Sequence, residues 1–375
     1  MNKEMDNKFF DDLLEDDGPA VLMIREHLMS VEGADGVVFP PTYPKGDKNN
    51  FKGGYNIDRY RHQMFVGNEK NICQIDSVGS QANRIEPIFE KEKYKELVPQ
   101  VTIKAGEEEI SIFKVGHRAA DALIRCSSMQ DELREVFKKV LKGQHWDLAK
   151  IAPTSLVFGV WDSRDTQAKL PRIVESTIRA FDVNEMTRSA VYFPPVNYEK
   201  QELVDDKNDK DIMSKVGLVA VPSTGTHGGI IARGGIERVA TLNLRLIRDL
   251  SAGSKEEDKE HTNILKRYIL GLSLVAFTYP ASRYLRQGCN LVLDPEKPCE
   301  LYMVLSNGKK ENYDFTHEDL LSYAEIIAGE FFKACGEGYS KSKDRDVQFD
   351  KERVNAELKD ASEEKGNKKT TKAKK

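Results

Sequence analysis

The chain has 375 residues, of which 39% are hydrophobic and 31% are charged, and its formal net charge is −4 at pH 7. Because no run approaches 18 apolar residues, the composition predicts a globular protein without a membrane span, built as one elaborated domain or two average ones. The acidic start MNKEMDNKFFDDLLEDD is unlike a secretory signal, and the five cysteines include no CxxC pair. We therefore expect a cytoplasmic protein with free thiols, neither a disulfide scaffold nor a zinc protein.

The first half of the chain predicts a mixture of helices and strands. Its apolar spacing favours a short helix over 19–30, and residues 40–62 form a long Pro-, Gly- and Asn-containing loop. The further expected elements are a strand over 72–76, a helix over 80–94, a hairpin from 101–104 and 109–113, and helices over 117–126 and 129–141. Residues 155–161 and 171–183 favour strands, because β-branched and apolar side chains are frequent in them.

In the second half of the chain, the sequence predicts an inserted segment, further core elements and a C-terminal tail. The charged segment 198–215 is expected to protrude, and KGNKKTTKAKK at the end has six lysines in eleven residues. The expected elements between them are a helix over 261–278, strands over 289–294 and 300–305, and a helix over 317–335. The class is α+β. We expect an acidic segment and flexible loop over 1–62, a core over 63–339 and a disordered tail over 340–375.

Charge is unevenly distributed along the chain. Residues 1–35 contain 3 basic and 10 acidic side chains, whereas residues 341–375 contain 12 basic and 8 acidic ones. Such a distribution fits a protein that binds a polyanion on one face, a head-to-tail oligomer, or an ordinary solvated surface.

A block of glycines and arginines over 223–248 is the most informative feature for function. Arg233, Arg238, Arg245 and Arg248 accompany five glycines and His227. We expect a glycine-rich loop that a phosphate-bearing partner can approach closely. The block is not a nucleotide-binding phosphate loop, because Gly235-Ile236 stands where Lys-Ser/Thr is required. The sequence also lacks HExxH, GxSxG and dinucleotide-binding patterns, so we expect no cofactor, no metal and no catalytic site of these kinds.

Three further motifs combine basic residues with loop or helix-start signals. In SQANR, helix N-terminal amides and Arg84 could hold a phosphate, or Ser80 could simply cap the helix. In HRAADALIR, Arg118 and Arg125 share a helix face that could contact an RNA backbone; alternatively, His117 caps the helix and the arginines face solvent or pair with Asp121. WDSRDTQAKLPR suits phosphate contact with base stacking, or a buried Trp161 with surface charge.

Four blocks occur in a fixed order: IDSVGSQANRIE, HRAADALIR, VFGVWDSRDTQAKLPRIVESTIRAFDV and HGGIIARGGIERVATLNLRLIR. Together they resemble the Cas-seven-type RAMP subunit of type I-G CRISPR systems, formerly called type I-U, over roughly residues 65–335. The resemblance implies an RRM-like (ferredoxin-like) palm elaborated by insertions. It also implies antiviral defence in a Cascade complex, in which copies polymerise head-to-tail along the CRISPR guide RNA beside other subunits and the target DNA strand. Residues 40–62 and 198–215 are candidates for a thumb-like projection.

The resemblance also implies which residues contact the guide. The residues expected to contact or approach RNA are Asn83, Arg84, Arg118, Arg125, Arg164, Lys169, Arg172, His227, Gly228, Gly229, Arg233, Gly234, Gly235 and Arg238. The usual RRM pair of stacking aromatic residues is not evident. Type I backbone subunits are not nucleases, so no catalytic residue is expected. The alternative is a RAMP-type endoribonuclease that processes the guide precursor with His117 or His227 as general acid/base; a phosphate-binding metabolic enzyme is a weaker possibility.

Overall fold

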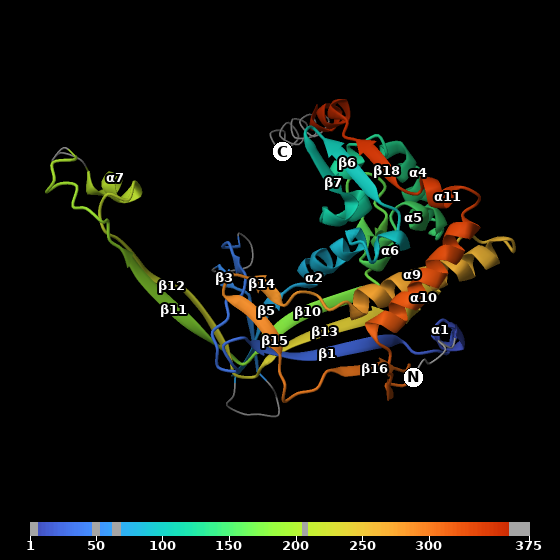
Figure 1. Cartoon of the computed structure of the whole chain (residues 1–375), viewed down its shortest axis with the longest axis horizontal. Helices are drawn as coiled ribbons and strands as arrows, with labels where there is room; N and C mark the ends of the chain where they lie inside the picture. Colours follow the sequence, from blue (N-terminus) through green and yellow to red (C-terminus); the bar gives the residue numbers. More distant parts are fainter. Residues whose placement is uncertain (1–6, 47–52, 62–68, 205–208, 360–375) are drawn as a thin grey trace, which may run out of the picture.

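A computed structural model describes residues 7–46, 53–61, 69–204 and 209–359. It shows an α+β protein whose curled antiparallel sheet is compatible with an RRM-like palm carrying insertions. The palm sheet and its covering helices form the centre, a second lobe lies to one side of the helices, and a long arm projects from the opposite end (Figure 1). The predicted loop over 40–62, insertion over 198–215 and tail over 340–375 each extend partly outside the described residues.

The palm contains a nine-stranded antiparallel sheet. Along its main path the strands are β14 (Tyr284–Arg286), β15 (Cys289–Leu293), β1 (Val21–Ser30), β13 (Ile236–Asn243), β10 (Val174–Phe181), β5 (Glu69–Asp76) and β4 (Ile57–Arg61). The remaining strands are β16 (Glu300–Val304), which pairs with β1, and β17 (Lys310–Asn312). The predicted strands over 72–76, 171–183, 289–294 and 300–305 are confirmed.

The predicted helix over 19–30 is wrong, because these residues form the central strand β1. Leu22, Ile24 and Leu28 are buried at alternating positions, as a strand with one covered face requires. β13 pairs on one side of β1, and β15 and β16 pair on the other. Residues 21–30 therefore belong to the core of the palm and not to a separate N-terminal segment.

Two long helices, α9 (Asp258–Thr278) and α10 (His317–Ala334), pack against each other on one face of the sheet (Figure 1). They confirm the helices predicted over 261–278 and 317–335. A Cβ atom at Gly271 would lie 3.1 Å from the Cα atom of Ala324, so this glycine permits a close approach of the two helices. α10 begins with a capping box between Thr316 and Asp319, which satisfies backbone groups at its N-terminus.

The second lobe is closed by the C-terminal part of the chain. β18 (Arg345–Gln348) pairs in parallel with β6 (Val101–Ala105), which also pairs with β7 (Glu108–Ser111). The elements packed around this sheet include α4 (Gln130–Val140), α5 (Trp146–Ile151) and α11 (Tyr339–Ser342). The predicted hairpin and the predicted helix over 129–141 are confirmed. Disorder predicted from residue 340 is wrong for 340–359, because residues 351–359 are also helical.

The arm is a β-hairpin of β11 (Val183–Tyr192) and β12 (Val221–Ala232), with α7 (Lys210–Lys215) at its tip (Figure 1). The protrusion predicted over 198–215 is confirmed, and its stalk reaches back to residues 183 and 232. The glycine-rich block is not a loop, contrary to expectation. Residues 223–232 lie in β12, and Arg233 to Gly235 turn the chain into β13. The strand predicted over 155–161 is wrong for its first half, where α6 (Thr154–Val157) precedes β8 (Val160–Trp161).

Candidate nucleic-acid interface

The arm meets the palm at a surface that combines guanidinium groups with aromatic rings. We call this surface the seam. Its residues are Phe39, Tyr55, Asp76, Arg84, Arg188, His227, Tyr284 and Arg286. A smaller hydrophobic cluster, which includes Cys73, Ile178, Ile230 and Leu291, joins palm strands to the base of the arm. Hydrophobic packing against the palm strands therefore fixes the base of the arm, in addition to the hydrogen bonds within its hairpin.

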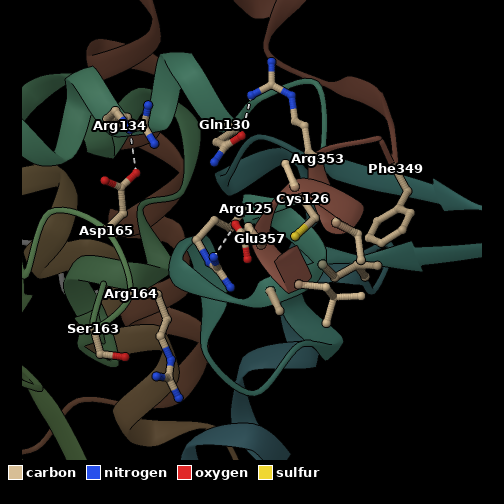
Figure 2. A pocket seen from close by; sticks show the side chains of 15 residues that line it. Arg125, Cys126, Gln130, Arg134, Ser163, Arg164, Asp165, Phe349, Arg353 and Glu357 are labelled. Atoms are coloured by element: carbon tan, nitrogen blue, oxygen red, sulfur yellow. Dashed lines mark hydrogen bonds and ion pairs between the residues drawn. The ribbon is translucent and has the colours of Figure 1, made fainter. Parts of the chain in front are cut away.

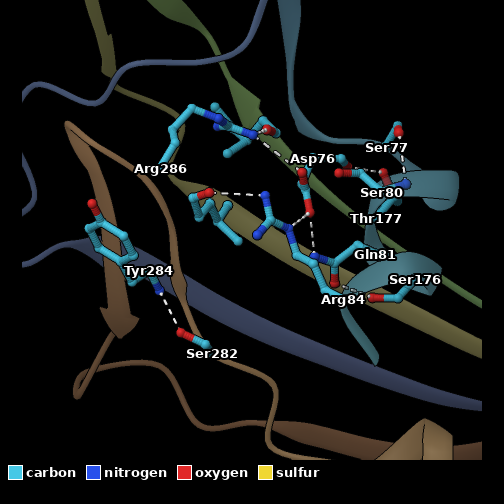
Figure 3. Close-up of polar contacts among 12 residues, drawn as sticks. Asp76, Ser77, Ser80, Gln81, Arg84, Ser176, Thr177, Ser282, Tyr284 and Arg286 are labelled. Atoms are coloured by element: carbon cyan, nitrogen blue, oxygen red, sulfur yellow. Dashed lines mark hydrogen bonds and ion pairs between the residues drawn. The ribbon is translucent and has the colours of Figure 1, made fainter. Parts of the chain in front are cut away.

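Asp76 is the buried centre of the seam, with 1% of its surface exposed. Its Oδ2 atom accepts hydrogen bonds from Gln81 Nε2 at 2.6 Å and from Arg84 Nε at 3.0 Å, and its Oδ1 atom lies 3.3 Å from an Arg286 Nη atom (Figure 3). One carboxylate thus faces two guanidinium groups. Because the arginine side chains are 33% and 25% exposed, the excess positive charge can attract an anion from solvent.

Helix α2 (Val78–Ile85) begins directly after Asp76. Ser77 is its N-cap and accepts a hydrogen bond from the Ser80 amide at 3.2 Å, so Ser77 and not Ser80 caps the helix. A Cβ atom added at Gly79 would meet nothing within 4 Å, which leaves the first turn accessible. The partial positive charge of this helix end adds to that of Arg84 and Arg286. Asn83 is exposed on the same helix, as its predicted role requires.

The seam contains aromatic side chains that could stack on bases, although the sequence motifs showed no such pair. Tyr284 is 57% exposed, and the Tyr55 and His227 rings lie 5.0 Å apart. The Arg188 guanidinium carbon lies 5.8 Å from the centre of the Phe39 ring. These residues come from segments scattered between 39 and 286, so no local motif joins them. The one local signal was RYLRQG, in which Tyr284 and Arg286 precede a glycine.

The glycines of the block have protein neighbours. Gly229 has φ +95° and donates its amide to the Tyr55 hydroxyl at 2.8 Å, and a Cβ there would clash with Val37. A Cβ at Gly228 would lie 2.7 Å from the Thr187 carbonyl oxygen, and one at Gly234 would lie 2.9 Å from the Phe181 backbone. Gly235, with φ +87°, completes the turn. Glycine is needed at positions 228, 229 and 234 because protein atoms pack where a Cβ atom would lie, so the close approach of an RNA strand is not required to explain them.

Arg118 and Arg238 are buried in ion pairs, which argues against their predicted phosphate contacts. The Arg238 guanidinium lies 3.1 Å from Glu26, and its Nε donates to Ser176 at 3.0 Å. Arg118 Nε lies 2.7 Å from a Glu86 oxygen, and both side chains are at most 4% exposed. Burial raises the pKa of Glu86 to about 7 and lowers that of Arg118. To reach a phosphate, Arg118 would have to leave the buried Glu86 carboxylate uncompensated. Arg238 would have to give up its buried contacts with Glu26 and Ser176.

The other predicted residues divide into two groups. Arg164 and Arg233 are exposed and have no side-chain partner within the described parts of the chain, and Lys169 lies over the exposed Trp161 ring, 5.4 Å from its centre. The predicted alternative of a buried tryptophan is therefore wrong. In the second group, Arg172 is half-buried beside Gly159, and Arg125 contacts Glu357. Arg125 and Arg164 line one cleft in the second lobe (Figure 2).

Structural contacts connect the seam to the Trp161 hairpin. Asn83 on α2 lies beside Gly116, and Glu86 after α2 holds Arg118, whose Nη1 donates to the Gly159 carbonyl oxygen at 3.3 Å. Gly159 immediately precedes the strand that carries Trp161. The seam and the Trp161 hairpin, which both carry exposed cationic or aromatic groups, are thus fixed relative to each other by buried contacts that follow α2.

The two histidines considered for catalysis are both exposed. His227 contacts the Tyr55 ring, and the His117 amide donates to Asp121, which is the N-cap of α3 (Ala122–Arg125). His117 stands at the N-cap position of the short 3-10 helix Arg118–Ala120, but its side chain makes no capping hydrogen bond, so its predicted capping role is confirmed in position only. Within the described residues, no group of three or more His, Cys, Asp or Glu side chains could hold a metal ion, and no helix is long and apolar enough to cross a membrane.

Comparison with known protein families matches part of these surfaces, and Arg188, His227, Tyr284 and Arg286 of the seam lie outside the matched residues. A family described as CRISPR-associated protein GSU0053 matches residues 22–185, which run from β1 to the first residues of β11 and include α2 and the Trp161 hairpin. No curated protein matches the chain. Over the matched residues the chain is similar to CRISPR-associated proteins, and this similarity supports a role in CRISPR defence.

Proposed function

We propose that this chain is an RNA-binding backbone subunit of a type I-G (formerly I-U) Cascade complex, in which copies polymerise along the CRISPR guide and hold it for pairing with target DNA. The family match and the ordered sequence blocks support this assignment. The observation that carries it is the seam, where two partly exposed guanidinium groups and the open first turn of α2 surround Asp76. The exposed Tyr284 ring lies on the same strand as Arg286.

The seam is suited to an RNA strand that is bound without recognition of its base sequence. Arg84 and Arg286 already donate to Asp76 and to backbone carbonyl oxygens of Leu285, Phe39 and Ile75, so they would attract phosphates through their net positive charge. Phosphates are the same in every nucleotide. The exposed Tyr284 ring offers a stacking surface that accepts any base. Such a subunit can hold guides of any sequence and leave the edges of the bases free for pairing.

The arm supports polymerisation. Its tip exposes large apolar side chains, including Phe193 at 72% and Val216 at 63% exposure. Clustered exposed apolar residues are typical of protein interaction surfaces. An apolar tip that binds a different surface on the next copy makes a heterologous contact, and such contacts build open filaments. We propose that the arm makes this head-to-tail contact.

Arg188→Ala tests the RNA-binding surface without burying an unpaired charge, since Arg188 is exposed. We expect about a tenfold loss of affinity for single-stranded RNA of any sequence, because an exposed cation of the seam is removed. The slope of log affinity against log salt should fall by about 0.7. Fluorescence anisotropy over a salt series measures both quantities. Tyr284→Ala should weaken binding with a smaller change in slope.

Arg245→Ala is the matched control, because Arg245 is exposed on α8 (Leu244–Arg248), at the far end of β13 from the arm. Equal losses in Arg188→Ala and Arg245→Ala would show that binding is a property of overall charge, and the seam would then not be the guide site.

Cleavage of the guide precursor is the alternative activity, and the exposure of His117 and His227 keeps both accessible to a substrate. Under our proposal the chain binds repeat-containing RNA in EDTA and leaves it intact. Specific cleavage that disappears in His117→Ala or His227→Ala would contradict a purely binding role.

A further inference from the structure

The second lobe contains an open cleft of about 1020 Å³. Its walls come from α3, α4, the turn between β8 and β9 (Lys169–Leu170), and the C-terminal segment from Phe349 to Leu358 (Figure 2). Four arginines converge on it: Arg125, Arg134, Arg164 and Arg353. Arginine forks from several separate segments are well suited to the phosphates of a polynucleotide.

Three of these arginines are neutralised by carboxylates of the same chain. Arg134 Nε lies 2.6 Å from Asp165, Arg353 lies 2.8 Å from Asp131, and Arg125 contacts Glu357. Arg164 is exposed and has no side-chain partner in the ranges that the structure describes. Of these carboxylates, only Glu357 comes from the C-terminal helix, so movement of that helix would expose the Arg125 guanidinium.

The C-terminal helix over 351–359 is held mainly by polar contacts. None of its side chains is buried, and Leu358 is 64% exposed. The preceding strand β18 is anchored differently, because Val347 is 3% exposed and the strand pairs with β6. We expect the helix to detach near Asp350 while the lobe stays closed, because only partly exposed polar contacts hold the helix, whereas β18 is paired and packed.

We propose that this cleft is a second binding site for single-stranded RNA, and that Glu357 occupies Arg125 in the free chain where an RNA phosphate binds in the loaded one. Trp161 supports a single strand as the ligand. Its ring is 55% exposed on the hairpin that also carries Arg164, and Lys169 lies over it. A stacking ring beside cations matches single-stranded nucleic acid, whose bases are available to stack. The inference rests on the proposed function, because its ligand is the single-stranded RNA that we propose this chain binds.

Glu357→Gln tests the competition between carboxylate and phosphate. We expect affinity for a single-stranded RNA of about 30 nucleotides to rise about three- to tenfold, whereas a six-nucleotide RNA of about one site's length binds unchanged. Glu352→Gln is the matched control, because it removes the same charge from an exposed position of the same helix. It should leave both affinities unchanged. Arg164→Ala should lower affinity for the long RNA only.

A second substitution tests the route through Arg125. Arg125→Ala added to Glu357→Gln should remove the gain. Asp131→Asn removes one of the two carboxylates that hold Arg353, which loosens the helix and should reproduce part of the gain. Melting temperatures of all variants show whether each is folded.

Wild-type affinity in both Glu357→Gln and Asp131→Asn would overturn the cleft proposal. A gain in affinity that persists without Arg125, or that is equal for duplex RNA, would also overturn it. If Arg188→Ala binds normally while Glu357→Gln gains affinity, the seam fails and the cleft stands.

Discussion

Arg233 and Arg238 lie five residues apart in one basic block, and the structure gives them opposite environments. Arg233 projects from the turn between β12 and β13, whereas Arg238 faces the core and pairs with Glu26. The register of β13 causes the difference, because Ile236, Arg238 and Ala240 alternate onto the covered face. Both residues are arginines of the same basic block, so the sequence motif alone does not show which one is exposed and which one is buried.

This contrast gives a prediction for two single substitutions. Arg238→Ala should lower the free energy of unfolding by about 1–3 kcal/mol, because it removes a buried partner of Ser176 and Glu26, although Arg283 still pairs with Glu26. Arg233→Ala should change it by less than about 0.5 kcal/mol, as expected for an exposed side chain. Urea denaturation measures both values. Similar values for the two variants would contradict the assigned environments.

The buried pair of Glu86 and Arg118 predicts a dependence of stability on pH. Because the pKa of Glu86 is raised to about 7 from 4.5, the folded chain binds more protons than the unfolded chain between these values. The free energy of unfolding should therefore fall as pH rises from about 4.5 to 7, by at most about 1.4 kcal/mol per unit for this group. Glu86→Gln should remove this component, which urea denaturation from pH 5 to 7 can measure. Parallel pH profiles for the two proteins would contradict it.

At the scale of elements, the sequence predicts a helix or strand correctly where its apolar periodicity extends over many residues. Elsewhere, contacts with distant parts of the chain decide the secondary structure. The long helices α9 and α10 follow from apolar patterns that extend over many turns, and β10 follows from its β-branched alternation. β1 was predicted as a helix because its short apolar run fits both periods, and only the neighbouring strands select the extended form. Glycines made β12 look like a loop, although several of them are needed for close packing at the base of the arm.

The arm gives a prediction about assembly. Tyr192 pairs with Val221 at the end of the hairpin, so replacing residues 193–220 by Asn-Gly should close it with a two-residue turn. We expect the melting temperature to stay within a few degrees, because this tip adds little to the core; Met213 is one of its few buried side chains. The shortened chain should bind RNA as single copies and fail to add further copies as the RNA lengthens. Analytical ultracentrifugation on RNAs of increasing length measures this, and unchanged filament growth would place the contact elsewhere.

At the scale of the whole molecule, the palm and the second lobe share one hydrophobic core. The larger cluster includes Leu22 of the sheet, Leu270 of α9, Ile103 of β6 and Leu133 of α4. The sequence motifs located part of the candidate interface, namely α2 and the Trp161 hairpin. They could not locate Phe39, Arg188 or Arg286, because only the folded chain brings the arm, the palm and the 284–288 segment together.

The central position of β1 has a consequence for synthesis of the protein. β1 ends at Ser30, whereas its partners β13 and β16 end at residues 243 and 304, so about 270 residues must follow before both edges of this strand are paired. At about 5–20 residues per second, the nascent chain carries an unpaired strand for on the order of tens of seconds. Sheets that depend on such distant pairings form slowly. The ribosome-bound chain is therefore a substrate for chaperones, and expression at lower temperature or with chaperones should raise the yield of folded protein.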